Sequence, residues 1–116
     1  MVIIVDSGST KADWCIVEDG CVLSMVTTQG INPIHQMPET IKEVVNKQLF
    51  VDTNFCQTLL QSSHDERIKA YFYGSGCIEK KVQSMKVILE GAFAEYNVEF
   101  FVYSDLLGAA RATCGI

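Results

Sequence analysis

A cluster of small polar residues follows the first apolar run of the chain, and its residue types suit phosphate and metal binding. The cluster consists of Asp6, Ser7, Gly8, Ser9 and Thr10. Glycine lets the backbone approach a ligand closely or adopt a positive φ, successive N–H groups in such a turn can bind a phosphate, and hydroxyls add further donors. A carboxylate on a rigid strand can bind Mg²⁺ directly or through water. The same residues also suit a polar hairpin in which Asp6 caps its own turn, so the local pattern leaves both interpretations open.

Three further positions are candidates for chemistry. Asp105 follows an apolar run, where it could act as a general base aimed into a cleft or could cap the following helix. The sequence Gly74-Ser75-Gly76 suits either a ligand contact or an ordinary strand-to-helix turn. Asn32 stands between a glycine and a proline, where it is either a turn residue or a sugar contact. For each position taken alone, the structural interpretation is the more common one.

The strands and helices that must position these residues are predicted from the apolar pattern. Strands are predicted at residues 2–5, 12–18, 21–28, 68–73 and 98–103. Asp19-Gly20 is a strong hairpin signal, so the first three strands are expected to form an antiparallel meander. Helical spacing of apolar residues predicts helices that begin at Pro38, near residue 78 and near residue 106. Residues 50–67 give no clear pattern, although Phe55, Leu59 and Leu60 could continue a helix.

The order of the elements predicts the topology of the sheet. Strand-helix-strand connections cross over right-handed and make neighbouring strands parallel. We therefore expect an α/β fold with a mixed five-stranded sheet of order 3-2-1-4-5 and flanking helices. The β-branched run at residues 2–5 predicts a first strand that is buried on both faces. Because the first, fourth and fifth strands are parallel, the polar clusters after them should meet at the carboxyl edge, where open α/β sheets bind ligands.

The composition fits one domain with its own core and argues against three classes of protein. With a formal net charge of -5 and no basic run, the chain is not expected to bind nucleic acid, because phosphate neutralisation needs clustered Lys and Arg. The apolar runs are far shorter than the ~20 residues of a membrane-spanning helix, so no membrane partner is expected. The stretch Val2 to Val5 has no basic region before it and meets Asp6 at once, so it predicts a strand rather than a signal peptide.

The five cysteines do not follow a metal-binding or disulfide pattern. Their number is odd and no two have C-x-x-C spacing, which indicates neither a zinc site nor a disulfide framework. We expect buried free thiols in the reducing environment of a cytoplasmic protein. The residues concerned are Cys15, Cys21, Cys56, Cys77 and Cys114.

Four segments together resemble a known family. The run from Asp6 to Trp14 resembles the first phosphate-binding motif of the actin/hexokinase/Hsp70 superfamily, in the version of the N-acetylglucosamine kinases and the BadF/BadG/BcrA/BcrD ATPases. The segments 30–33, 74–76 and 104–109 agree with the same family in the same order. The resemblance covers nearly the whole chain except about residues 50–67. It implies a ribonuclease-H-like fold, with residues 1–116 as the N-terminal actin-like ATPase domain of a sugar kinase.

The resemblance also implies roles in binding ATP and Mg²⁺. Asp6 would organise Mg²⁺ and its waters, and Gly8, Ser9 and Thr10 would contact the β- and γ-phosphates of ATP. Lys11 is a further candidate for the phosphates, although a solvated lysine is the more common case for such a residue. The second phosphate loop and the adenosine site would belong to a C-terminal domain beyond residue 116, so we expect residues 1–116 alone to fold without turning over substrate.

The substrate implied by the resemblance is an amino sugar such as N-acetylglucosamine. Asn32 would hydrogen-bond a sugar hydroxyl, the segment Gly74-Ser75-Gly76 would contribute to the sugar site, and Asp105 would accept the proton of the attacking hydroxyl. Residues 33–35 (Pro-Ile-His) lack an aromatic residue that some members of the family carry after this asparagine, which leaves the identity of the sugar open.

Two alternatives to the kinase remain open at this point. One is an activator ATPase of the BadF/BadG type, and the other is a non-catalytic domain that senses a sugar or serves as a scaffold. The segment 30–33 favours the kinase over the activator, and the two carboxylates Asp6 and Asp105 at one sheet edge count against a scaffold. The expected partners are the amino-sugar substrate and the C-terminal domain of the same protein, and a homodimer of the complete protein is left open.

Overall fold

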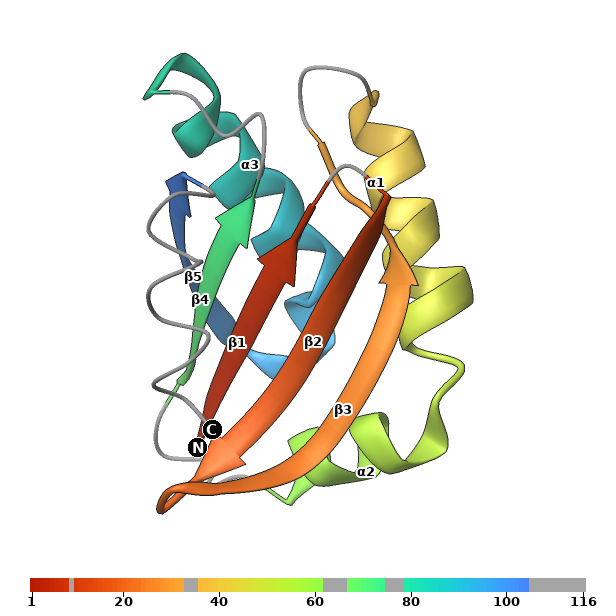
Figure 1. The fold of residues 1–116 in the computed structure, drawn as a ribbon, viewed down its shortest axis with the longest axis vertical. Coiled ribbons are helices and arrows are strands. Elements are labelled where there is room, and N and C mark those ends of the chain that lie inside the picture. Colours follow the sequence, from red (N-terminus) through yellow and green to blue (C-terminus); the bar gives the residue numbers. More distant parts are fainter. Residues whose placement is uncertain (9, 33–35, 62–66, 75–78, 105–116) are drawn as a thin grey trace.

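The computed structural model describes residues 1–8, 10–32, 36–61, 67–74 and 79–104. Its centre is a five-stranded sheet of order β3-β2-β1-β4-β5, the order predicted (Figure 1). β1 is antiparallel to β2 and parallel to β4, and β5 is parallel to β4. The strands are β1 (Val2–Ser7), β2 (Lys11–Glu18), β3 (Cys21–Gln29), β4 (Ile68–Gly74) and β5 (Val98–Ser104).

The hairpin between β2 and β3 has the turn that its sequence predicts. Asp19 and Gly20 have φ values of 52° and 78°, the left-handed conformation at both central positions that a type I′ turn requires. The turn joins Glu18 to its register partner Cys21. Beyond it, β3 has one extra residue at Leu23, because Ile16 pairs with Ser24 whereas Val17 pairs with Val22. Such a bulge increases the local twist of the strand pair.

The predicted helix from Pro38 is confirmed, although its second half is more loosely wound. α1 (Pro38–Val44) continues into a π-helical segment, η1 (Val45–Leu49). The unclear region contains α2 (Thr53–Leu60), which begins because the Asp52 side chain accepts a hydrogen bond from the Phe55 N–H at 2.9 Å. Phe55 and Leu59 of α2 are buried, whereas Leu60 is 62% exposed and does not join the core. The remaining helices are α3 (Glu79–Ala92) and the 3₁₀ turn η2 (Ala94–Tyr96), and the helix predicted from residue 106 lies outside the described residues.

The helices and one face of the sheet share a single core. Buried side chains of α1, η1, α2 and α3 belong to one cluster with Ile3, Val5, Trp14, Phe72 and Phe100 of the sheet. Trp14 is completely buried, stacks on Phe93 at a ring-centroid distance of 5.9 Å and donates a hydrogen bond from Nε1 to the Thr28 hydroxyl at 2.9 Å. Burial of each such ring stabilises the fold by roughly 1.5–3 kcal/mol.

The opposite face of the sheet is less buried than the sequence predicts. Ile3, Val5 and Ser7 of β1 are buried in the core, but the alternate residues of the same strand, Val2, Ile4 and Asp6, are only half-buried. The described helices all pack into the core on the other side, so the predicted burial of β1 on both faces is only partly met. On this second face, aromatic pairs shield β4 and β5, since Tyr71 stacks on Phe101.

The cysteine prediction also holds only in part. Cys15, Cys21 and Cys56 are free thiols, as expected. Cys15 is half-buried, and burial together with the nearby Asp13 carboxylate raises the pKa of its thiol. Cys21 is exposed instead of buried, because it begins β3 directly after the hairpin turn.

Candidate functional site

The carboxyl ends of the parallel strands meet in one row, as the topology predicted. Ser7 of β1 is the register partner of Gly74 in β4, and Gly74 is in turn the partner of Ser104 in β5. The ends of all three strands point to the same edge of the sheet (Figure 1). The described parts of the three polar clusters therefore line one edge of the sheet. Four residues of these clusters lie outside the described residues, and their roles stay predictions: Ser9, Ser75, Gly76 and Asp105.

Asp6 lies on the half-buried face of the sheet, close to a second carboxylate. Its register partners are Asp13 on β2 and Tyr73 on β4. Asp13 accepts a hydrogen bond from the Thr27 hydroxyl at 2.8 Å. Sequence reasoning gave Asp13 no role, although the hairpin register of the first two strands could have identified it as the neighbour of Asp6.

The two carboxylates have the donor chemistry that Mg²⁺ needs. Mg²⁺ prefers oxygen ligands and is usually bound through one or two carboxylates, water and substrate phosphates. Within the described ranges no group of three or more His, Cys, Asp and Glu side chains could hold a metal ion by itself. Asp6 therefore fits a site of this shared kind, with Asp13 as its neighbour.

The turn after β1 is a hairpin as well as a candidate phosphate loop. The Gly8 N–H donates to the Lys11 carbonyl at 2.9 Å, so this donor closes the hairpin. Gly8 does not have a positive φ, and a Cβ added to it would lie 3.7 Å from the Lys11 carbonyl oxygen, an ordinary contact. The hairpin itself therefore does not require glycine at this position. Thr10 and Lys11 are both exposed at this turn.

Asn32 lies in a segment that is attached to the end of β1. The completely buried Ser7 hydroxyl donates to the Ile31 carbonyl at 3.0 Å and accepts from the Ile31 N–H at 2.8 Å. A further backbone hydrogen bond joins the Gly30 N–H to the Thr10 carbonyl at 3.1 Å. These hydrogen bonds bring the segment that carries Asn32 against the end of β1 and the turn that follows it.

A second side chain, which sequence reasoning missed, closes the turn around Asn32. The Gln36 amide oxygen accepts from the Asn32 N–H at 2.9 Å, and its amide nitrogen donates to the Gly30 carbonyl at 3.0 Å. The Gln36 N–H donates to the Asn32 carbonyl at 3.0 Å. The only signal in the sequence is a glutamine four residues after the asparagine, which is too common a spacing to identify such a contact.

Of three comparisons with known proteins, only the one with solved structures found a similar protein. No protein-family model matches the chain, and no curated protein matches it. Among solved structures, the chain is similar to a proposed N-acetylglucosamine kinase from Porphyromonas gingivalis, with a TM-score of 0.80 and 36% sequence identity over 99% of this chain. The resemblance to the N-acetylglucosamine kinases is confirmed. The chain spans 38% of the length of that structure.

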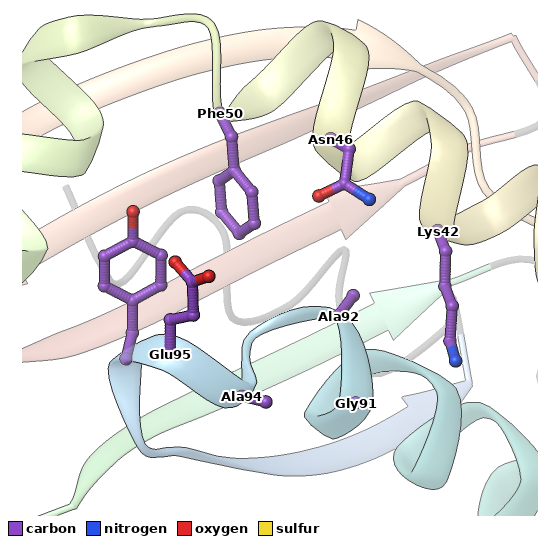
Figure 2. A pocket seen from close by; sticks show the side chains of 8 residues that line it. Lys42, Asn46, Phe50, Gly91, Ala92, Ala94 and Glu95 are labelled. Atoms are coloured by element: carbon purple, nitrogen blue, oxygen red, sulfur yellow. The ribbon is translucent and has the colours of Figure 1, made fainter.

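The described surface also has a cavity that lies apart from the sheet-edge site. It has a volume of about 290 Å³ and lies between the α1–η1 helix and the end of α3 with η2 (Figure 2). Lys42, Asn46 and Glu95 are polar residues of its wall, and Phe50 and Tyr96 are aromatic ones. None of the predicted site residues in the described part of the chain lines it.

The helices of the structure do not include a membrane span. None of those in the described residues is both long enough and apolar enough to cross a bilayer.

Proposed function

We propose that this chain is the N-terminal ATP-binding part of a kinase that phosphorylates N-acetylglucosamine or a related amino sugar. The observation that carries the proposal is the similarity to a protein assigned that activity, at 36% identity over 99% of the chain. The attachment of the Asn32 segment to the end of β1 supports it, because a kinase must position a sugar beside the phosphates of ATP. Since the chain spans 38% of that structure, a C-terminal domain would supply the second phosphate loop and the adenosine site.

Residues at the first strand end would bind the nucleotide. Asp6 would hold Mg²⁺ through its carboxylate, and Gly8 would let the backbone approach the β- and γ-phosphates. The hydroxyls of Ser9 and Thr10 would donate to phosphate oxygens, with Lys11 as a nearby positive charge. Bound MgATP would supply the γ-phosphoryl group. Phosphoryl transfer leaves little covalent work for the protein, so positioning and charge stabilisation would account for most of the rate.

Residues at the ends of the third, fourth and fifth strands would bind the sugar. Asn32 would hydrogen-bond a sugar hydroxyl, and Gly74, Ser75 and Gly76 would allow the ring to approach the end of β4. Asp105 would accept the proton of the attacking hydroxyl, so that its oxygen becomes a better nucleophile as the phosphoryl group transfers.

The test is a kinase assay on the complete natural protein that contains this chain. ADP release would be measured with ATP and Mg²⁺ in the presence of N-acetylglucosamine, glucosamine or glucose, and the product would be identified by mass spectrometry. We expect ADP release to depend on an N-acetylated amino sugar, with one phosphate added per sugar. ATP hydrolysis without a sugar acceptor would support the activator ATPase instead. Sugar binding without turnover would support the sensing domain.

A further inference from the structure

We infer that Ser7 and Gln36 are positioning residues for the sugar, because their side chains fix the backbone of residues 30–32 against the end of β1. The inference deepens the proposed function and rests on it, since it takes Asn32 as the sugar contact. Neither residue is proposed to touch the sugar. Both would act through the backbone that carries Asn32.

The Ser7 hydroxyl satisfies both backbone groups of one buried residue. Ile31 is completely buried, and its N–H and C=O both pair with Ser7 Oγ, at 2.8 and 3.0 Å. Buried backbone polar groups that lose their partner cost free energy, so removal of the hydroxyl would favour a shift of Ile31 away from β1. Asn32 follows Ile31 directly and would shift with it.

Gln36 fixes the same segment from the other side. Its amide bridges the Gly30 carbonyl and the Asn32 N–H, at 3.0 and 2.9 Å, so one side chain holds the residues on both sides of Ile31. This bridge needs an acceptor and a donor in one planar group, which only an amide side chain of this length supplies. Methionine has nearly the same length but neither group.

The two contacts also join the sugar residue to the nucleotide turn. Ser7 precedes Gly8 in the chain, and the Gly30 N–H donates to the Thr10 carbonyl at 3.1 Å. The same hydrogen bonds therefore join the segment of Asn32 to Ser7 and to Thr10. The side-chain hydrogen bonds of Gln36 go to Gly30 and Asn32, and Gln36 reaches the nucleotide turn only indirectly, through Gly30. Its loss should therefore affect the sugar more than ATP.

The experiment compares Gln36→Met and Ser7→Ala with a matched control in the complete protein. Gln48→Met is the control. The Gln48 amide oxygen accepts from the N–H of Gln29, the last residue of β3, at 2.7 Å. Within the described residues, the side-chain hydrogen bonds of Gln48 go to Gln29 and not to residues 30–32. In Gln36→Met we expect the KM for the sugar to rise about tenfold while the KM for ATP changes by less than about twofold. Ser7→Ala should raise both values. Gln48→Met should leave both unchanged.

Amide hydrogen exchange, measured by NMR, tests the positioning without any assay of activity. Gln36→Met should speed the exchange of the Asn32 amide, Ser7→Ala should speed that of the Ile31 amide, and the control should change neither. Unchanged exchange in both variants, or a rise in the sugar KM no larger than that of ATP in Gln36→Met, would overturn the inference. If the amides exchange faster in the variants while the wild-type protein phosphorylates no sugar, the proposed function is refuted. The backbone positioning by Ser7 and Gln36 would still stand.

Discussion

Asp6 and Asp13 are register partners on the antiparallel strands β1 and β2, so two carboxylates lie side by side on the half-buried face of the sheet. Like charges directly opposite each other in a sheet destabilise it. The hydroxyl of Thr27 offsets part of this repulsion, because it donates to Asp13 at 2.8 Å. The arrangement is expected where a carboxylate serves a cation at some cost to the stability of the fold.

The pair gives a first prediction, which separates a metal-binding aspartate from its neighbour. Asp6→Asn should lower Mg²⁺-dependent turnover of the complete protein at least tenfold, whereas Asp13→Asn should change it much less. Asp13→Asn should raise the free energy of unfolding by about 0.2–1 kcal/mol, because it removes one charge of the like-charge pair and keeps an oxygen that can accept from Thr27. Turnover as a function of Mg²⁺ concentration, together with urea denaturation, measures both effects. Equal turnover for wild type and Asp6→Asn would leave this residue as a part of the hairpin only.

A second prediction concerns two glycines that should behave in opposite ways. Gly8→Ala should change the free energy of unfolding by less than about 0.5 kcal/mol, because the added Cβ makes only ordinary contacts. It should lower kcat/KM for ATP by roughly 10²-fold, because the methyl group displaces the phosphates.

Gly20→Ala is the control for this glycine. Gly20 has a φ of +78°, so alanine there should destabilise the fold by about 1–2 kcal/mol and leave the kinetics unchanged. Chemical denaturation and initial rates on the same two samples check the contrast. Loss of stability without loss of activity in Gly8→Ala would contradict a phosphate contact at this position.

A third prediction tests Asp105, which the family resemblance makes the general base. Asparagine caps helices about as well as aspartate, so Asp105→Asn should leave the melting temperature nearly unchanged. A general base contributes roughly 10²–10⁴-fold in rate, and the variant should lose that factor in kcat with the sugar saturating. A loss below tenfold with an unchanged melt would identify the residue as a helix cap.

A fourth prediction concerns the pH dependence of Tyr96, at the wall of the cavity in Figure 2. Burial, a hydrogen bond with Cys56 and the nearby Glu95 carboxylate raise the pKa of this phenol from 10.0 to about 12. Because the folded pKa lies above the unfolded value, the contribution to stability is complete below about pH 10 and is lost as the pH rises towards 12.

Ultraviolet titration of the tyrosinate band checks this value. The wild type should show a late step near pH 12 that is absent from Tyr96→Phe, and the variant should lose less stability between pH 10 and 12. Glu95→Gln should move the step to lower pH, because it removes the negative charge of the carboxylate. A wild-type titration that is complete near pH 10 would contradict the raised pKa.

The sequence determined the elements and the order in which they assemble. The pattern of apolar residues located all five strands within one or two residues of their observed ends, because the apolar pattern of a strand and the turn residues that bound it are local properties of the chain. Asp19-Gly20 determined its turn type through the backbone conformations that these two residues tolerate. The handedness of the crossovers then brought Ser7, Gly74 and Ser104 into one row without any further information.

Only the tertiary structure decided which side chains meet. Ser7 and Ile31 are 24 residues apart in the chain, and no local pattern indicates that one hydroxyl satisfies both backbone groups of the other residue. The bridge made by Gln36 and the pairing of Asp6 with Asp13 likewise depend on how segments lie against each other. The helices packed on one face of the sheet and left Asp6 on the other, which spacing alone did not reveal. Hydrogen-bond partners and the face that a strand buries are set by long-range packing, so residue types and their periodicity cannot specify them in advance.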